Sequence, residues 1–333
     1  MSSSQFHTKL AKYINTGCID RTDLFLSLAK PNLPFYKNAG EIIKMWGNSE
    51  DRVIGKSLNF TCNKYTGENK KVKEMMQYIN QELSDELFGA YVHGSLATND
   101  SISYSDFDGL IILKNEVMRD RKKLINTAIK LSKAYSIMIS MDALQHHGWF
   151  VLTEKDCKNW PVTYFPPVLF DYSKSLLNSG KNIEITYLTS DTNNKNSLNR
   201  LCNSIIRHLS KNAIPENSFQ LKSILSEYML MPSLYLQYKN GTGIYKKYSF
   251  EEASKDFKSE DWRIMNEVSD IRTKWKLNSG LTLTDYPKII TPWVKKSQIK
   301  HSSKVPDELM QKLDSEFIAR MIKLTNLIRN KIL

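Results

Sequence analysis

The sequence has few cysteines and no long apolar run, and each absence excludes a class of protein. The chain of 333 residues contains 4 cysteines, at Cys18, Cys62, Cys157 and Cys202, with no Cys-x-x-Cys pair. Such wide spacing argues against a cysteine zinc site or a disulfide framework, so we expect four reduced cysteines in or near the core. No segment approaches the roughly 18 to 20 apolar residues of a membrane-spanning helix.

Glycine and proline are also sparse, with 13 and 10 residues, which excludes collagen-like or linker material. Hydrophobic residues make up 41% of the chain and aromatic residues 11%, enough for a packed core. The length suits about two domains. The N-terminus is polar and lacks the apolar stretch of a signal peptide. We therefore expect a soluble cytoplasmic protein with no membrane partner.

Positive charge exceeds negative charge. There are 47 Lys and Arg against 35 Asp and Glu, a formal net charge of +12. This excess favours polyanionic partners such as nucleic acid or nucleotide phosphates. The basic residues are spread along the chain with no block of five or six, so composition alone does not indicate a nucleic-acid-binding module.

Hydrophobic periodicity predicts helices over residues 4–14, 72–83, 116–135 and 306–333, and a capping-box sequence at Ser249 predicts another helix start. Short apolar runs bounded by polar or glycine residues predict strands over 87–92, 107–113, 137–144 and 148–152. Residues 31–60 show no assignable pattern. We therefore expect an α+β protein in which a small mixed β-sheet flanked by helices (residues 1–170) precedes a mainly α-helical domain (171–333).

The most informative segment is YVHGSLATNDSISYSDFD, residues 91–108. A predicted strand ends there at Gly94 and Ser95. Glycine lets the backbone approach a ligand closely, and exposed N–H groups with a serine hydroxyl form a small seat for phosphate oxygens. The turn is therefore a candidate phosphate site.

Two carboxylates follow on the next predicted strand. A period of two places Asp106 and Asp108 on the same face, with Phe107 pointing oppositely into the core. Neighbouring carboxylates repel one another unless a cation lies between them. A hard ion such as Mg²⁺ fits, because it keeps substrate phosphates and waters as further ligands.

Neither half of the motif is specific alone. Asp-x-Asp also occurs as a solvated strand end, and sugar-nucleotide-dependent glycosyltransferases use it to hold a metal. The distinguishing feature is Gly94-Ser95 on the preceding strand, separated from Asp106 by residues 96–105. A phosphate seat one strand away from a metal site is the arrangement needed to hold a nucleoside triphosphate with its metal.

This segment resembles the signature of the DNA polymerase beta-like nucleotidyltransferase superfamily, in which Gly-Ser precedes Asp-x-Asp or Asp-x-Glu. It is most similar to the aminoglycoside (kanamycin-type) branch, through Gly94–Leu96 and Tyr104–Asp106. By element order the resemblance covers roughly residues 70–160. Thr98 departs from the arginine that several members carry, which concerns the aminoglycoside substrate rather than nucleotidyl transfer.

The resemblance implies a two-metal site with a third carboxylate on a later strand. Asp106 and Asp108 would hold Mg²⁺ ions, and Asp142, on the predicted strand 137–144, matches the third carboxylate, which ligates the second metal and acts toward the acceptor hydroxyl. Glu154 and Asp156 are rivals for that role.

Gly94 and Ser95 would hold the triphosphate. Lys246, beside Lys247, resembles a basic element with which helical domains of the superfamily reach the triphosphate; two solvated surface lysines are the alternative.

Three histidines lie near these residues in the sequence, and we do not assign them to the metal site. His146 and His147 either reach the acceptor or a phosphate, or bond to the backbone of a turn. We do not expect them to be metal ligands, because adjacent residues on an extended chain point in opposite directions. His93 is interpreted as structural.

The implied activity is transfer of a nucleoside monophosphate, AMP from ATP in the favoured case, to a hydroxyl of a small-molecule acceptor with release of pyrophosphate. RNA, such as a tRNA end, or protein is the alternative acceptor. A catalytically silent nucleotide-binding homologue is the third possibility.

Overall fold

The computed structural model describes residues 3–49, 53–179, 182–188, 191–210, 215–276 and 302–332. Part of the predicted helical domain, residues 277–301, lies outside this set. The described chain is a mixed α+β structure of small sheets flanked by helices, as expected. It packs into two compact units, one containing the strands and one helical.

The first unit includes the described residues up to 101 and residues 105–188. Its helices are α1 (Ser3–Thr16), α2 (Asp23–Ala29), α3 (Leu33–Gly47), α4 (Lys70–Glu82), α5 (Asn115–Arg119) and α6 (Arg121–Met141). Its strands are β1 (Lys56–Thr61), β2 (Leu87–His93), β3 (Asp108–Leu113), β4 (Phe150–Thr153), β5 (Lys174–Ser175) and β6 (Asn182–Tyr187). Single-turn 3₁₀ helices occur at Gly94–Leu96, Glu154–Lys158 and Pro167–Tyr172.

Four strands form a mixed sheet in the order β4-β3-β2-β5. Strand β2 is antiparallel to β3 and β5, whereas β3 and β4 are parallel. In this register His93 lies opposite Asp108, and Leu110 lies opposite Phe150. The end of β2 and the beginnings of β3 and β4 therefore meet at one end of the sheet. Strands β1 and β6 form a separate antiparallel pair.

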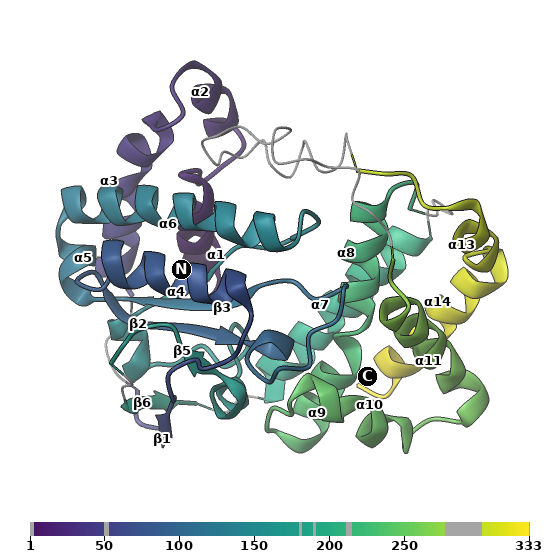
Figure 1. Ribbon diagram of the computed structural model, residues 1–333. Coiled ribbons are helices and arrows are strands. Elements are labelled where there is room, and N and C mark those ends of the chain that lie inside the picture. Colours follow the sequence, from purple (N-terminus) through teal and green to yellow (C-terminus); the bar gives the residue numbers. More distant parts are fainter. Residues whose placement is uncertain are drawn as a thin grey trace. The chain divides into compact units, whose positions relative to one another are not determined.

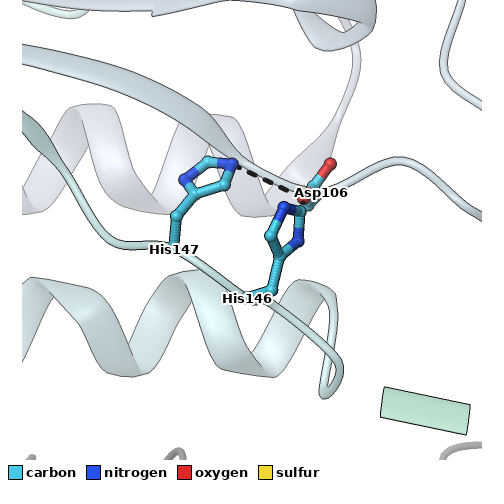
Figure 2. A group of neighbouring side chains, drawn as sticks. All are labelled: Asp106, His146 and His147. Carbon is cyan, nitrogen blue, oxygen red and sulfur yellow. Dashed lines mark ion pairs between the residues drawn. The ribbon is translucent and has the colours of Figure 1, made fainter. Parts of the chain in front are cut away.

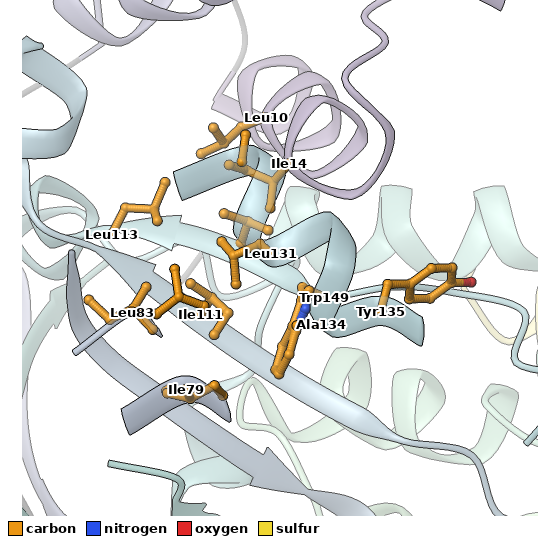
Figure 3. Packing of buried hydrophobic residues seen from close by; sticks show 14 of the residues in the cluster. Leu10, Ile14, Ile79, Leu83, Ile111, Leu113, Leu131, Ala134, Tyr135 and Trp149 are labelled. Atoms are coloured by element: carbon orange, nitrogen blue, oxygen red, sulfur yellow. The ribbon is translucent and has the colours of Figure 1, made fainter. Parts of the chain in front are cut away.

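The two faces of the four-stranded sheet bury different cores. Helices α1, α3, α4 and α6 pack their apolar stripes on one face, where Ile111, Leu113 and Trp149 meet side chains such as Leu131 (Figure 3). On the other face, Leu110 and Ile112 pack against Phe165 and the apolar side of the β1–β6 pair. Figure 1 shows α4 and α6 on one side of β2 and β3, and β1 and β6 on the other. The sheet is thus buried on both faces.

The second unit is helical and includes residues 102–104 of the connection between β2 and β3. Its described helices are α7 (Asp191–Leu209), α8 (Ser218–Tyr228), α9 (Met231–Asn240), α10 (Lys246–Ser254), α11 (Ser259–Thr273), α13 (Asp307–Lys312) and α14 (Ser315–Asn330). Tyr104 is buried within it, where its hydroxyl donates to the Lys222 carbonyl over 2.8 Å. Among the described residues, no helix combines the length and apolarity needed to cross a membrane.

Most predicted elements are confirmed, namely the helices at 4–14 and 72–83 and the strands at 87–92, 107–113 and 148–152. The strand predicted over 137–144 is wrong, because these residues form the last turns of α6 and its end. Ile137, Met138 and Ile139 are buried there, and a short apolar run cannot by itself distinguish a buried strand from a buried helix. The four cysteines are buried and free, as expected.

Side-chain caps and helix positions explain the other differences. The helix predicted over 116–135 is two helices, because the Asp120 carboxylate accepts N–H groups of the first turn of α6. The helix predicted at the C-terminus is likewise interrupted before Asp314, which caps α14. The capping box at Ser249 is wrong, since Ser249 lies inside α10 and donates to the Lys246 carbonyl. The unassigned region 31–60 contains α3 and β1.

Candidate functional site

The two aspartates of the motif converge on one point. Asp106 lies just before β3 and Asp108 begins it, while Phe107 between them is fully buried in the core. Carboxylate oxygens of both aspartates approach Nε2 of His147, over 3.5 Å from Asp106 and 3.1 Å from Asp108. The predicted arrangement, with both acids on one side and Phe107 on the other, is confirmed.

The Gly94 turn lies against these acids. Gly94 has φ +69°, and a Cβ added there would lie 2.5 Å from Oδ2 of Asp108. Only glycine accepts both this left-handed backbone and this close approach. Ser95 follows in the 3₁₀ turn, and its hydroxyl donates to Oγ of Ser105, beside Asp106, over 2.9 Å. The predicted phosphate seat and the predicted metal ligands are therefore immediate neighbours.

Two histidines complete the cluster (Figure 2). Nδ1 of His146 lies 3.0 Å from Oδ2 of Asp106, and the two imidazole centroids are 4.8 Å apart. The expectation that His146 and His147 point in opposite directions is wrong, because residues 145–149 form an irregular segment rather than a strand. Both rings consequently face Asp106.

Two side-chain amides, one buried and one half-buried, hold this histidine segment in place. The side chain of Gln145 accepts from the Phe107 N–H over 2.8 Å and donates to the carbonyls of Phe107 and His147 over 2.9 and 2.8 Å. Asn15, on α1, accepts from the Trp149 N–H over 2.9 Å and donates to its carbonyl over 3.0 Å. These side-chain clamps fix the histidines relative to the aspartates.

Gly148 permits the second clamp. A Cβ at Gly148 would lie 2.2 Å from Oδ1 of Asn15. Sequence reasoning missed Gln145 and Asn15, because an isolated amide carries no local pattern that predicts its partner.

The charged groups of the cluster shift one another's pKa values. Burial works to lower the pKa of His147, but its bond to Asp108 and the charges of both aspartates outweigh burial and raise the pKa to about 9. Burial likewise works to raise the pKa of Asp108, and the His147 bond is among the contacts that hold it below its usual value. Burial lowers the pKa of His93, against the opposing pull of Asp108.

The donor set fits a divalent cation. Ligand atoms of Asp106, His146 and His147 all lie within 4.8 Å of one another. Side-chain exposures of 15% for Asp106, 24% for His146 and 26% for His147 show that the three residues are only partly buried. A cation held there would keep coordination positions for water or substrate, as catalytic metal sites do.

The three candidates for the third carboxylate, Asp142, Glu154 and Asp156, make contacts outside the Asp106–His146–His147 group. Asp142 caps the end of α6, where its Oδ1 accepts from the Leu144 N–H over 3.0 Å, and the Asp106–His146–His147 group does not include it. Asp156 closes a capping box with Thr153 and lies 2.9 Å from Nε2 of His7. Glu154 accepts from the Asn115 N–H. The role predicted for Asp142 remains a prediction.

Lys246 begins α10 in the helical unit and is half-buried. Its predicted reach to the triphosphate remains a prediction.

Comparison with known proteins found no family model, no curated protein and no solved structure that matches this chain. Its function is therefore inferred from the chemistry of the site and from the motif that the site contains.

Proposed function

We propose that the protein is a divalent-metal-dependent nucleotidyltransferase that moves a nucleoside monophosphate, with ATP as the favoured donor, to a hydroxyl group and releases pyrophosphate. The observation that carries this proposal is the meeting of Asp106 and Asp108 beside the Gly94 turn, where Gly94 has no room for a side chain. A cation site in contact with a phosphate seat is what a metal-bound triphosphate requires.

The order of elements supports a nucleotidyltransferase fold. Strand β2 is followed by Gly94-Ser95, antiparallel β3 begins with the second aspartate of the motif, α6 crosses over, and β4 returns parallel to β3. The resemblance of the motif implies an order of strand, strand, helix and strand, with a third carboxylate on the last strand, whereas β4 carries no carboxylate. In the structure this order of elements brings the loop before β4 to the end of the sheet where Asp106 and Asp108 lie.

Different residues of the site would have different roles in the reaction. Asp106 and Asp108 would hold the cation, Mg²⁺ on the resemblance, which neutralises charge that develops on the phosphate oxygens. The Gly94–Ser95 turn would hold the β- and γ-phosphates, and the Ser95 hydroxyl would donate to a phosphate oxygen in place of Ser105. The acceptor oxygen then attacks the α-phosphorus in line, the α–β bridging bond breaks, and pyrophosphate leaves.

The acceptor proton needs a base. Asp142 is the proposed base or second-metal ligand, as the resemblance implies. A small-molecule hydroxyl is the proposed acceptor, while the net charge of +12 is the one feature that favours RNA.

The proposed activity is tested by following a radioactive α-phosphate from the nucleoside triphosphate into the product. The full chain is incubated with each α-³²P nucleoside triphosphate, Mg²⁺ or Mn²⁺, and cell extract. We expect label from ATP in small molecules. The Asp106→Ala and Asp108→Ala variants should transfer none while keeping the wild-type circular dichroism spectrum. Asp171→Ala, an exposed acid of the same unit, is the matched control and should keep wild-type transfer.

The distribution of label decides between the alternatives. Label in RNA or protein keeps the chemistry and changes the acceptor. Wild-type turnover in either aspartate variant would refute the assigned site. Nucleotide binding without any transfer would favour the catalytically silent homologue.

A further inference from the structure

Imidazole nitrogens surround the two acids more closely than a pure Mg²⁺ site requires. His147 contacts both aspartates, and His146 lies 3.0 Å from Asp106. Mg²⁺ is a hard ion that prefers oxygen donors and keeps several waters. Imidazole instead suits first-row transition-metal ions such as Fe²⁺, Co²⁺ and Zn²⁺. The donor set therefore differs from the all-carboxylate set that the resemblance implies.

Two of the three separations between the donor atoms match the edges of a coordination polyhedron. Atoms about 2.1 Å from one ion lie about 3.0 Å apart at right angles and about 3.4 Å apart at the tetrahedral angle. The separations from Oδ2 of Asp106 are 3.0 Å to His146 and 3.5 Å to His147. The third pair, the two histidine nitrogens, lies within 4.8 Å, so one ion can bind all three atoms if the imidazole rings adjust their positions.

The nitrogen of His146 supports this interpretation. Its Nδ1 is buried and, within the described part of the chain, makes no hydrogen bond, although Oδ2 of Asp106 is only 3.0 Å away. The pair is close but not aligned as donor and acceptor. Two lone pairs directed at a common ion would give this short, misaligned contact.

His93 provides a second, independent observation. The residue is only 6% exposed, and its Nε2 has no hydrogen-bond partner among the described residues. Directly opposed residues of antiparallel strands project to the same face, so His93 shares the face of Asp108, its partner in register. A buried imidazole nitrogen without a partner is costly unless a ligand satisfies it.

We propose that this cluster binds a first-row transition-metal ion in preference to Mg²⁺, with Asp106, His146 and His147 as ligands. Asp108, 3.1 Å from His147, and His93, its register partner, are candidate further donors. The inference concerns the site of the proposed function and rests on it for a role in catalysis. Binding of the ion itself needs no nucleotide and can be measured separately.

The experiment titrates the metal-free full chain with Co²⁺ alone and follows the visible d–d bands, with Mn²⁺, Zn²⁺ and Mg²⁺ as competitors. We expect one Co²⁺ per chain. Nitrogen ligation predicts that affinity rises from Mn²⁺ through Co²⁺ to Zn²⁺, with Mg²⁺ weakest. Thermal unfolding with and without Co²⁺ gives an independent readout, because a ligand that binds only the folded state raises Tm.

Two variants test the ligands. His147→Gln and His146→Gln should each weaken Co²⁺ binding by at least roughly tenfold and change the d–d spectrum. His208→Gln is the matched control, because His208 also lies beside a carboxylate, Glu227, at 3.3 Å, but on α7 in the helical unit. It should bind Co²⁺ like the wild type. Each variant is compared by circular dichroism in metal-free buffer.

Failure of this inference is distinct from failure of the proposed function. Absence of Co²⁺ binding, equal affinity for Mg²⁺, or unchanged binding in both histidine variants would overturn the inference even if Mg²⁺-dependent nucleotidyl transfer is found. Histidine-dependent Co²⁺ binding would support it even if no nucleotide is transferred.

Discussion

The side-chain amide of Gln145 forms two hydrogen bonds with the backbone of Phe107, one to its N–H over 2.8 Å and one to its carbonyl over 2.9 Å. Neighbouring strands bond to each other in the same way. Because Phe107 lies between Asp106 and Asp108, and Gln145 directly precedes His146, this amide links the segment of the acids to the segment of the imidazoles.

Replacing Gln145 should therefore disturb both stability and metal binding. The Gln145→Ala variant leaves buried backbone groups of Phe107 without partners, at a cost of about 1 to 3 kcal/mol in the free energy of unfolding. We expect weaker Co²⁺ binding as well. Gln237→Ala is the control, because Gln237 is also buried and bonds Asn194 in the helical unit. The Gln237→Ala variant should lose stability without any change in Co²⁺ affinity. An equal loss of affinity in both variants would contradict a specific role of Gln145 in positioning the metal ligands.

The Gly94 turn gives a second prediction. Gly94→Ala places a Cβ 2.5 Å from Asp108, whereas Gly241 has nearly the same φ, +68°, with no atom within 4 Å of an added Cβ. Gly241→Ala should therefore show only the left-handed backbone cost of about 1 to 2 kcal/mol. Gly94→Ala should be less stable than that and should lose nucleotidyl transfer. Equal Tm values and full activity would show that the contact with Asp108 is unimportant.

The third carboxylate can be identified by comparing two neutral variants. If Asp142 is the base, Asp142→Asn should lower kcat by about 10²- to 10⁴-fold and leave Co²⁺ binding unchanged. Asp108→Asn should abolish transfer, because it removes a proposed ligand. Full activity of Asp142→Asn would exclude Asp142 as the base.

Acid stability should depend on Asp23, far from the site in the sequence. Its buried carboxylate accepts from the Ile19 N–H over 2.7 Å and from Nδ2 of Asn38 and Nζ of Lys37 over 2.8 and 2.9 Å. Burial alone would raise the pKa of Asp23, but these bonds outweigh burial and hold it below its usual value. A lowered folded-state pKa contributes stability above the unfolded pKa of about 3.9, and this stability is lost as pH falls through the folded value.

Asp23→Asn should thus be less stable than the wild type at pH 7 by about 1 to 3 kcal/mol. The difference should shrink as pH falls below about 4, measured by denaturant unfolding at several pH values. Asp85→Asn, at an exposed acid of the same unit, should follow the wild-type curve throughout. A difference that stays constant down to pH 2 would contradict the assignment.

Local sequence pattern was sufficient to predict those features that depend only on residues close together in the chain. The period of two along β3 placed Asp106 and Asp108 together, since alternation is a property of any extended chain. Apolar spacing likewise located α1 and α4. The same reasoning failed at residues 137–144, where a buried helix end and a buried strand have the same composition.

Residues close together in the chain were enough to predict the Gly-Ser turn, the paired acids and most of the helices and strands around them. The orientation of His146 and His147 toward Asp106 depends instead on long-range packing. That outcome depends on an irregular segment held by Gln145, which is 38 residues from Phe107, and by Asn15, 134 residues from Trp149. Such contacts between a side chain and a distant backbone segment leave no periodic trace in the chain, because they form only when the elements of the unit pack around their common core.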